Sequence, residues 1–83
     1  MTQAEYNAKV QELQAMWGDA SSFGTHHDKH GQMTMAFFQV YWDGVHHVLG
    51  RQRKPLMPDS TYEWDEDAEM LLRGSFAGAL AHS

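Results

Sequence analysis

Residues 32–49 have the sequence Gln-Met-Thr-Met-Ala-Phe-Phe-Gln-Val-Tyr-Trp-Asp-Gly-Val-His-His-Val-Leu, and this segment fits two different structures. The Asp43-Gly44 pair between two apolar runs is typical of the turn of a β-hairpin, in which strands 33–42 and 45–50 would pair. The same residues also fit one α-helix that continues through both runs. The hairpin would give an α+β domain, and the helix would give an all-α domain.

The angular distribution of the polar residues favours the helix. At about 100° per residue, all the polar side chains except Thr34 fall within one arc of about 100°. These residues are Gln32, Gln39, Asp43, His46 and His47. A half-buried strand needs alternating polar and apolar residues, and the consecutive apolar residues in 37–38 and 40–42 interrupt that alternation. The sequence therefore predicts a largely apolar helix over 32–49, with the hairpin as the alternative.

A helix is also predicted over about residues 3–17. Thr2 and Glu5 have the spacing of a capping box, in which each side chain accepts a hydrogen bond from the backbone of the other residue. Gly18 can adopt the positive φ that often ends a helix. Between them the apolar residues repeat at helical intervals: Tyr6, Val10, Leu13 and Trp17.

A third helix is predicted over about residues 61–80. Asp59, Ser60 and Thr61 offer N-caps after a proline-containing linker. The side chains expected to face the core are Trp64, Ala68, Leu71, Leu72, Ser75 and Ala79. Residues 18–31 show no periodicity and are expected to form a loop. The sequence thus predicts one all-α, three-helix domain over residues 1–83.

Composition and charge exclude several classes of protein. A chain of 83 residues and 9.5 kDa has the size of a single domain. The absence of cysteine excludes disulfides and thiolate zinc sites. A net charge of −5 argues against general nucleic-acid binding. The polar N-terminal residues and the lack of a run of about 20 apolar residues predict a cytoplasmic protein without a membrane span.

The predicted central helix has more apolar surface than two partner helices can cover. Phe38 and Trp42 are four residues apart on its apolar face, and Phe76 lies outside the stripe of the third helix. We expect these three side chains to contact a partner or a second copy. The sequence therefore predicts a homo-oligomer.

The histidines form two groups that would suit a transition metal. Neutral imidazoles bind zinc, copper, nickel or iron, and a zinc site needs three or four ligands. The candidate ligands are His26, His30, His46 and His47. The pattern is not the His-Glu-x-x-His motif of zinc proteases. The simpler interpretation is a set of solvated polar residues.

An acidic run occupies the start of the predicted third helix. Its carboxylates are Glu63, Asp65, Glu66, Asp67 and Glu69. The helix dipole favours acidic residues at this position, which would explain the run without any function. Alternatively, the run forms a negative surface that occupies a basic groove of a partner protein. For the basic residues Arg51, Arg53 and Lys54 we expect helix C-capping or ion pairs with the acidic segment.

No pairing of a nucleophile with a base is evident, so we expect a non-enzymatic protein. The function predicted from the sequence is a small acidic protein-interaction module that occupies a partner surface. Steric inhibitors, including phage-encoded viral proteins, and small assembly factors act in this way. The basic groove of a nucleic-acid-binding protein would be one such surface. The alternative function is a histidine-based metal-binding protein, with zinc or another transition metal.

Overall fold

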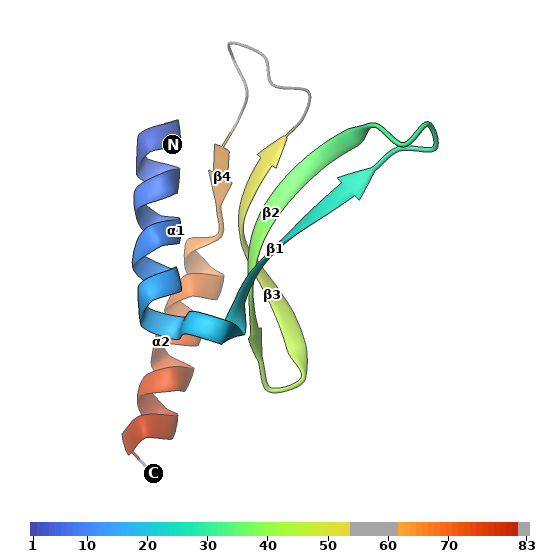
Figure 1. Cartoon of the computed structure of the whole chain (residues 1–83). Helices are drawn as coiled ribbons and strands as arrows, with labels where there is room; N and C mark the ends of the chain where they lie inside the picture. Colours follow the sequence, from blue (N-terminus) through green and yellow to red (C-terminus); the bar gives the residue numbers. More distant parts are fainter. Residues whose placement is uncertain (54–61, 82–83) are drawn as a thin grey trace.

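The computed structural model describes residues 1–53 and 62–81, and these residues form an α+β fold (Figure 1). The elements in chain order are α1 (Gln3–Trp17), the short 3₁₀ helix η1 (Gly18–Ala20), β1 (Ser21–His27), β2 (Met33–Trp42), β3 (Val45–Arg53), β4 (Tyr62–Trp64) and α2 (Glu66–Ala81). The predicted all-α, three-helix fold is wrong, because residues 32–49 form two strands of a sheet. The hairpin alternative describes this segment correctly.

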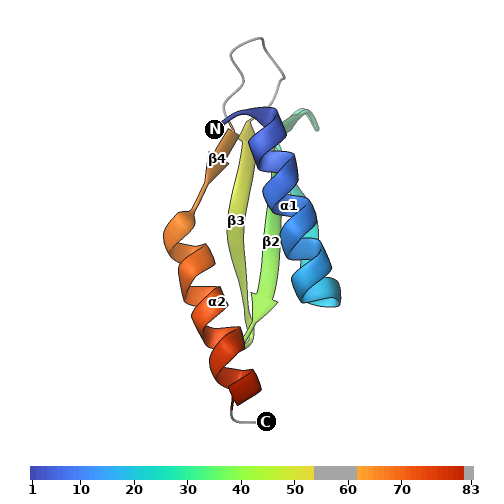
Figure 2. The same cartoon turned by 90° about the vertical axis from the view of Figure 1, so that its left-hand side faces the viewer.

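The four strands form one antiparallel sheet with the order β1-β2-β3-β4. Both helices cover the same face of this sheet, as the two views in Figures 1 and 2 show. Near the start of α1, the ring of Tyr6 lies 5.2 Å from that of Tyr62 in β4. The end of α1 continues through η1 into β1. The helix α1 therefore connects the two edges of the sheet across its covered face.

The β2–β3 turn explains why this segment is a hairpin. Asp43 has φ of 54° and Gly44 has φ of 78°, so both turn residues adopt positive φ. Two positive φ values are what a type I′ hairpin turn requires, and Asp-Gly is among the few pairs that accept them. Trp42 pairs with Val45 directly across the turn.

The helix prediction failed because aromatic residues lie on both faces of β2. Phe38 and Val40 point toward the helices and are fully buried. Phe37 and Tyr41 alternate with them, and the strand register therefore places them on the uncovered face. The residues do alternate between the faces, but the amino-acid types do not alternate between apolar and polar.

A bulge in β3 lies next to Gly50, where the rings of Tyr6 from α1 and Trp64 from β4 pack closely on the backbone of β3. Gln39 pairs with Val48 and Phe38 pairs with Gly50, which leaves Leu49 as an extra residue in β3. A Cβ atom on Gly50 would lie 2.6 Å from the ring of Tyr6 and 2.7 Å from that of Trp64. Only glycine leaves room for these two rings.

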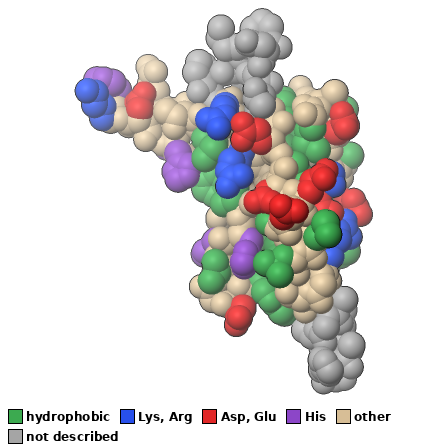
Figure 3. All heavy atoms as spheres, turned by 180° about the vertical axis from the view of Figure 1, so that it is seen from behind, with side chains coloured by type: hydrophobic (Ala, Val, Ile, Leu, Met, Phe, Trp, Pro, Cys, Tyr) green, Lys and Arg blue, Asp and Glu red, His purple; other side chains and the backbone are tan. Residues whose placement is uncertain are grey.

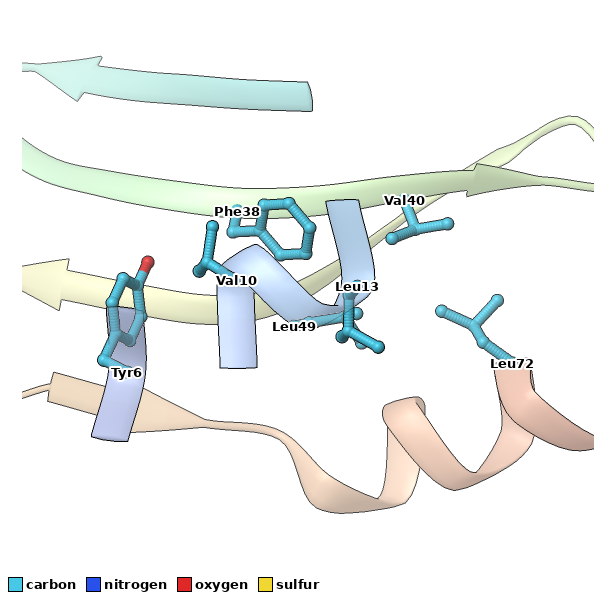
Figure 4. Packing of buried hydrophobic residues seen from close by; sticks show 7 residues of the cluster. All are labelled: Tyr6, Val10, Leu13, Phe38, Val40, Leu49 and Leu72. Carbon is cyan, nitrogen blue, oxygen red and sulfur yellow. The ribbon is translucent and has the colours of Figure 1, made fainter. Parts of the chain in front are cut away.

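The core lies between the sheet and the two helices (Figure 4). Its buried side chains are Tyr6, Val10, Leu13, Phe38, Val40, Leu49 and Leu72. The first three confirm the apolar stripe expected for the helix over 3–17. The capping box of Thr2 and Glu5 is also confirmed, with both hydrogen bonds at 3.1 Å.

The C-terminal helix begins later than expected. Residues 62–64 form β4, and α2 starts at Glu66. The predicted caps at 59–61 lie outside the described residues. Leu72 is buried as expected, whereas Leu71 is mostly exposed. No helix within the described ranges 1–53 and 62–81 is long and apolar enough to cross a membrane.

Candidate functional site

Four carboxylate residues from β4, the turn that follows it and the start of α2 line one shallow, open hollow of about 490 Å³. We call this group, Glu63, Asp65, Glu66 and Asp67, the acidic surface. Arg51 and Trp64 complete the lining of the hollow. The space-filling view shows acidic side chains gathered close to basic ones on this side of the molecule (Figure 3).

The turn between β4 and α2 brings these carboxylates together. The backbone N–H of Asp65 donates to the carbonyl of Leu49 at 2.7 Å, which holds the turn against β3. The carboxylate of Asp65 accepts a hydrogen bond from the backbone N–H of Ala68 at 3.0 Å and so caps α2. Glu66 and Asp67 follow in the first turn of the helix and are exposed. Their position fits the helix dipole as well as a negative contact surface.

Glu69 belongs to the predicted acidic run but lies in a different environment. Its side chain is only 12% exposed and accepts three hydrogen bonds. The donors are Lys9 Nζ at 2.9 Å, Trp64 Nε1 at 2.7 Å and Arg73 Nε at 2.8 Å. Arg73 also pairs with Glu12 of α1 at 3.2 Å. Glu69 therefore joins both helices and β4, and it is not available to a partner.

The pKa of Glu69 reflects two opposing effects. Burial by itself would raise the pKa of this carboxyl group. The hydrogen bonds from Lys9, Arg73 and Trp64 outweigh burial and hold the pKa below its ordinary value. Glu69 is thus an ionised group that stabilises the packing of the helices.

Glu63 also has an intramolecular partner. Its carboxylate pairs with Arg53 Nε at 3.0 Å, an ion pair of the kind expected between the basic and acidic segments. Glu66 and Asp67 form no ion pair with any other residue that the structure describes. These two carboxylates are therefore the ones that remain available on the acidic surface.

The four histidines proposed as metal ligands do not converge. His26 and His30 lie at and next to the β1–β2 turn, whereas His46 and His47 follow the β2–β3 turn. These two turns are at opposite ends of the sheet (Figure 1). The register also places His46 opposite Tyr41 on the uncovered face and His47 opposite Val40 on the covered face.

The contacts around His26 and His30 stabilise the local fold. The ring of His26 lies 5.0 Å from that of Phe37. Asp28 accepts hydrogen bonds from the backbone N–H groups of His30 and Gln32, at 2.8 Å and 3.0 Å, and so orders the turn. In the described part of the chain, no three His, Asp or Glu side chains are placed to hold one metal ion.

The aromatic residues expected to contact a partner lie in or against the core. Phe38 is fully buried, which corrects its assignment to a surface. Trp42 and Phe76 are half-buried and pack against each other with tilted rings whose centroids are 4.2 Å apart. The ring of Phe76 also lies 5.0 Å from that of Trp17 in α1. These side chains join α2 to the sheet and to α1.

Sequence reasoning missed the sheet face that the helices leave uncovered. The register places these side chains on it: Ser22, His26, Met35, Phe37, Gln39, Tyr41, His46, Val48, Arg51, Arg53 and Glu63. Aromatic and histidine rings contact each other there, with Tyr41 and His46 4.9 Å apart. Alternating the residues of 33–42 between two faces would have revealed this surface.

The chain was compared with known proteins at three levels. No family model, no curated protein and no solved structure matches it.

Proposed function

We propose that the protein is a small, non-enzymatic interaction module that binds a basic surface of a partner protein through its acidic surface. By occupying that surface it acts as a steric inhibitor or as an assembly factor. A basic nucleic-acid-binding groove is a partner surface of this kind. In this proposal the protein acts in the cytoplasm.

The observation that supports this proposal most directly is the convergence of the four carboxylates on one hollow. A shallow hollow lined by negative groups complements a protruding lysine or arginine side chain. Glu66 and Asp67 contribute charge that no described residue neutralises.

The test compares partner capture by the wild-type protein and by the double variant Glu66→Gln/Asp67→Asn. Both baits are incubated with a lysate of the organism that encodes the protein, and the captured proteins are identified by mass spectrometry. The proposal expects a basic protein that the variant captures much less. With that protein purified, the variant should lower the association rate constant several-fold at low salt. The difference should shrink at high salt, because salt screens exposed charges.

The matched control is Asp19→Asn/Asp43→Asn, which removes the same number of charges from exposed positions outside the acidic surface. Asparagine tolerates the positive φ of Asp43, so the β2–β3 turn is retained. The control should bind the partner as the wild type does. Equal loss in both variants, or no loss in either, would contradict the proposal.

A further inference from the structure

The outer edge of β1 has no strand beside it in the described chain. The sheet order makes β1 an edge strand, and its seven residues pair only with β2. An edge strand presents a row of backbone N–H and C=O groups that can pair with another chain. The register shift between His26 and His27 limits the regular part of this edge to residues 21–26.

The edge at β1 lacks most of the features that protect edge strands. Proteins usually protect an edge with lysine or other charged residues, with proline, or by making the strand very short. The sequence Ser-Ser-Phe-Gly-Thr-His of residues 21–26 contains no lysine, arginine, acidic residue or proline. Phe23 is also an exposed aromatic residue at this edge, with 59% of its surface accessible.

The opposite edge of the sheet, formed by β4, has the protective features that β1 lacks. The strand β4 has three residues, and one of them is the charged Glu63. Its other two residues, Tyr62 and Trp64, contact Tyr6 of α1. Of the two edges, only β1 is suited to pair with another strand.

We propose that two copies of this chain pair through β1, antiparallel, to form one eight-stranded sheet. A twofold axis perpendicular to the sheet, passing near Phe23 or Gly24, generates this pairing. Such an axis keeps each face on its own side. The helices of both copies then lie on one face, and the uncovered faces join into one surface.

The net charge of the chain does not oppose a second copy in this arrangement, and the edge strand itself carries no charged side chain that would repel its own copy. Each copy carries a net charge of −5, so two copies repel unless their acidic residues stay apart. The acidic surface lies at β4 and α2, on the other side of the sheet from β1. In the paired sheet the two β4 strands are seven strand spacings apart, or roughly 34 Å. That distance exceeds the Debye length of about 8 Å at physiological salt several-fold.

The test is the mass of the full chain in sedimentation equilibrium from low to high micromolar concentration. The proposal expects a reversible dimer of twice 9.5 kDa. Phe23→Lys places two like charges close together across the axis, and we expect it to raise the dimer dissociation constant at least about tenfold. Thr25→Lys changes another exposed residue of the same strand and should act in the same direction.

The matched control is Val45→Lys, which places the same charge on an exposed apolar residue of β3. It should change the dissociation constant by less than about twofold. Circular dichroism verifies that each variant keeps its secondary structure. A monomer at every concentration would overturn the proposal. A dimer that both β1 variants leave unchanged would overturn it as well.

Cysteine variants locate the axis, because the chain has no other cysteine. If the axis passes at Phe23, Phe23→Cys should form a disulfide between copies under mild oxidation. If it passes at Gly24, the double variant Phe23→Cys/Thr25→Cys should do so. A dimer that none of these variants cross-links would contradict the pairing through β1. This interface does not involve the acidic surface, so either proposal can fail without the other.

Discussion

The indole N–H of Trp64 donates a hydrogen bond of 2.7 Å to Glu69, and this bond connects the last strand to the second helix. Lys9 of α1 donates to the same carboxylate oxygen and lies 5.4 Å from the centroid of the Trp64 ring. Glu69 therefore links three elements that the chain brings together only on folding. Glu69, which was predicted from the sequence to contact a partner, has a structural role instead.

Glu69→Gln should destabilise the fold by about 2 kcal/mol. Charged hydrogen bonds to a largely buried carboxylate contribute more than neutral ones, and the amide cannot accept from all three donors. Urea unfolding followed by tryptophan fluorescence measures the change. Glu12→Gln is the control, because Glu12 pairs with Arg73 at an exposed position. That variant should change the free energy of unfolding by less than about 0.5 kcal/mol.

The lowered pKa of Glu69 predicts a loss of stability in acid. When a folded-state pKa lies below the unfolded-state value, the stabilisation is present above the unfolded value and is lost as the pH falls through the folded value. For Glu69 the loss should therefore begin near the ordinary pKa of 4.5 and continue below it. Thermal unfolding at a series of pH values should show a smaller acid-induced decrease in Glu69→Gln than in the wild type. An identical pH dependence in the two proteins would contradict this assignment.

Gly50→Ala should destabilise the fold by about 2 kcal/mol, because the new Cβ would overlap the rings of Tyr6 and Trp64. Gly74→Ala provides the opposite case. Gly74 lies in α2, and a Cβ atom there would point into open space, so alanine should stabilise the helix by about 0.5–1 kcal/mol. Denaturant unfolding of both variants measures the pair of effects. Equal effects in the two variants would contradict the close approach at Gly50.

Phe38→Ala should destabilise the fold by about 3–5 kcal/mol, because it leaves a cavity in a closely packed core. Tyr41→Ala is the control on the same strand, since Tyr41 points to the uncovered face and is half exposed. Tyr41→Ala should lower the free energy of unfolding by less than about 1 kcal/mol. Thermal unfolding of the two variants and the wild type measures these losses of stability. A small effect of Phe38→Ala would place this side chain on the surface, as the sequence first suggested.

Local signals in the sequence predicted the structure where short-range interactions determine it. The capping box at Thr2 and Glu5 requires only neighbouring residues, and the helix over 3–17 is confirmed to the residue. The Asp43-Gly44 turn is a local signal of the same kind. This signal indicates the observed hairpin, whereas the angular distribution of the polar residues favours a helix that does not form.

Structure that depends on distant partners could not be predicted in the same way. The strand β1 has no apolar periodicity and exists because its backbone pairs with β2. Trp64 fitted a helical stripe, yet it pairs with Gly50 as a strand residue. The acidic run of the candidate site was identified, but no local pattern indicates that the side chain of Glu69 faces inward. Its partner Lys9 is 60 residues away in the chain.

The same separation between Lys9 and Glu69 has a consequence for synthesis on the ribosome. The helix α1 is translated before the sheet, and the strand β4 and helix α2 that it contacts through Tyr6 and Lys9 are translated after the other three strands. Until they emerge, the apolar stripe of Tyr6, Val10 and Leu13 has no complete surface to pack against. The nascent chain must therefore fold late, after most of it has left the exit tunnel. During that interval α1 is a segment that chaperones can bind.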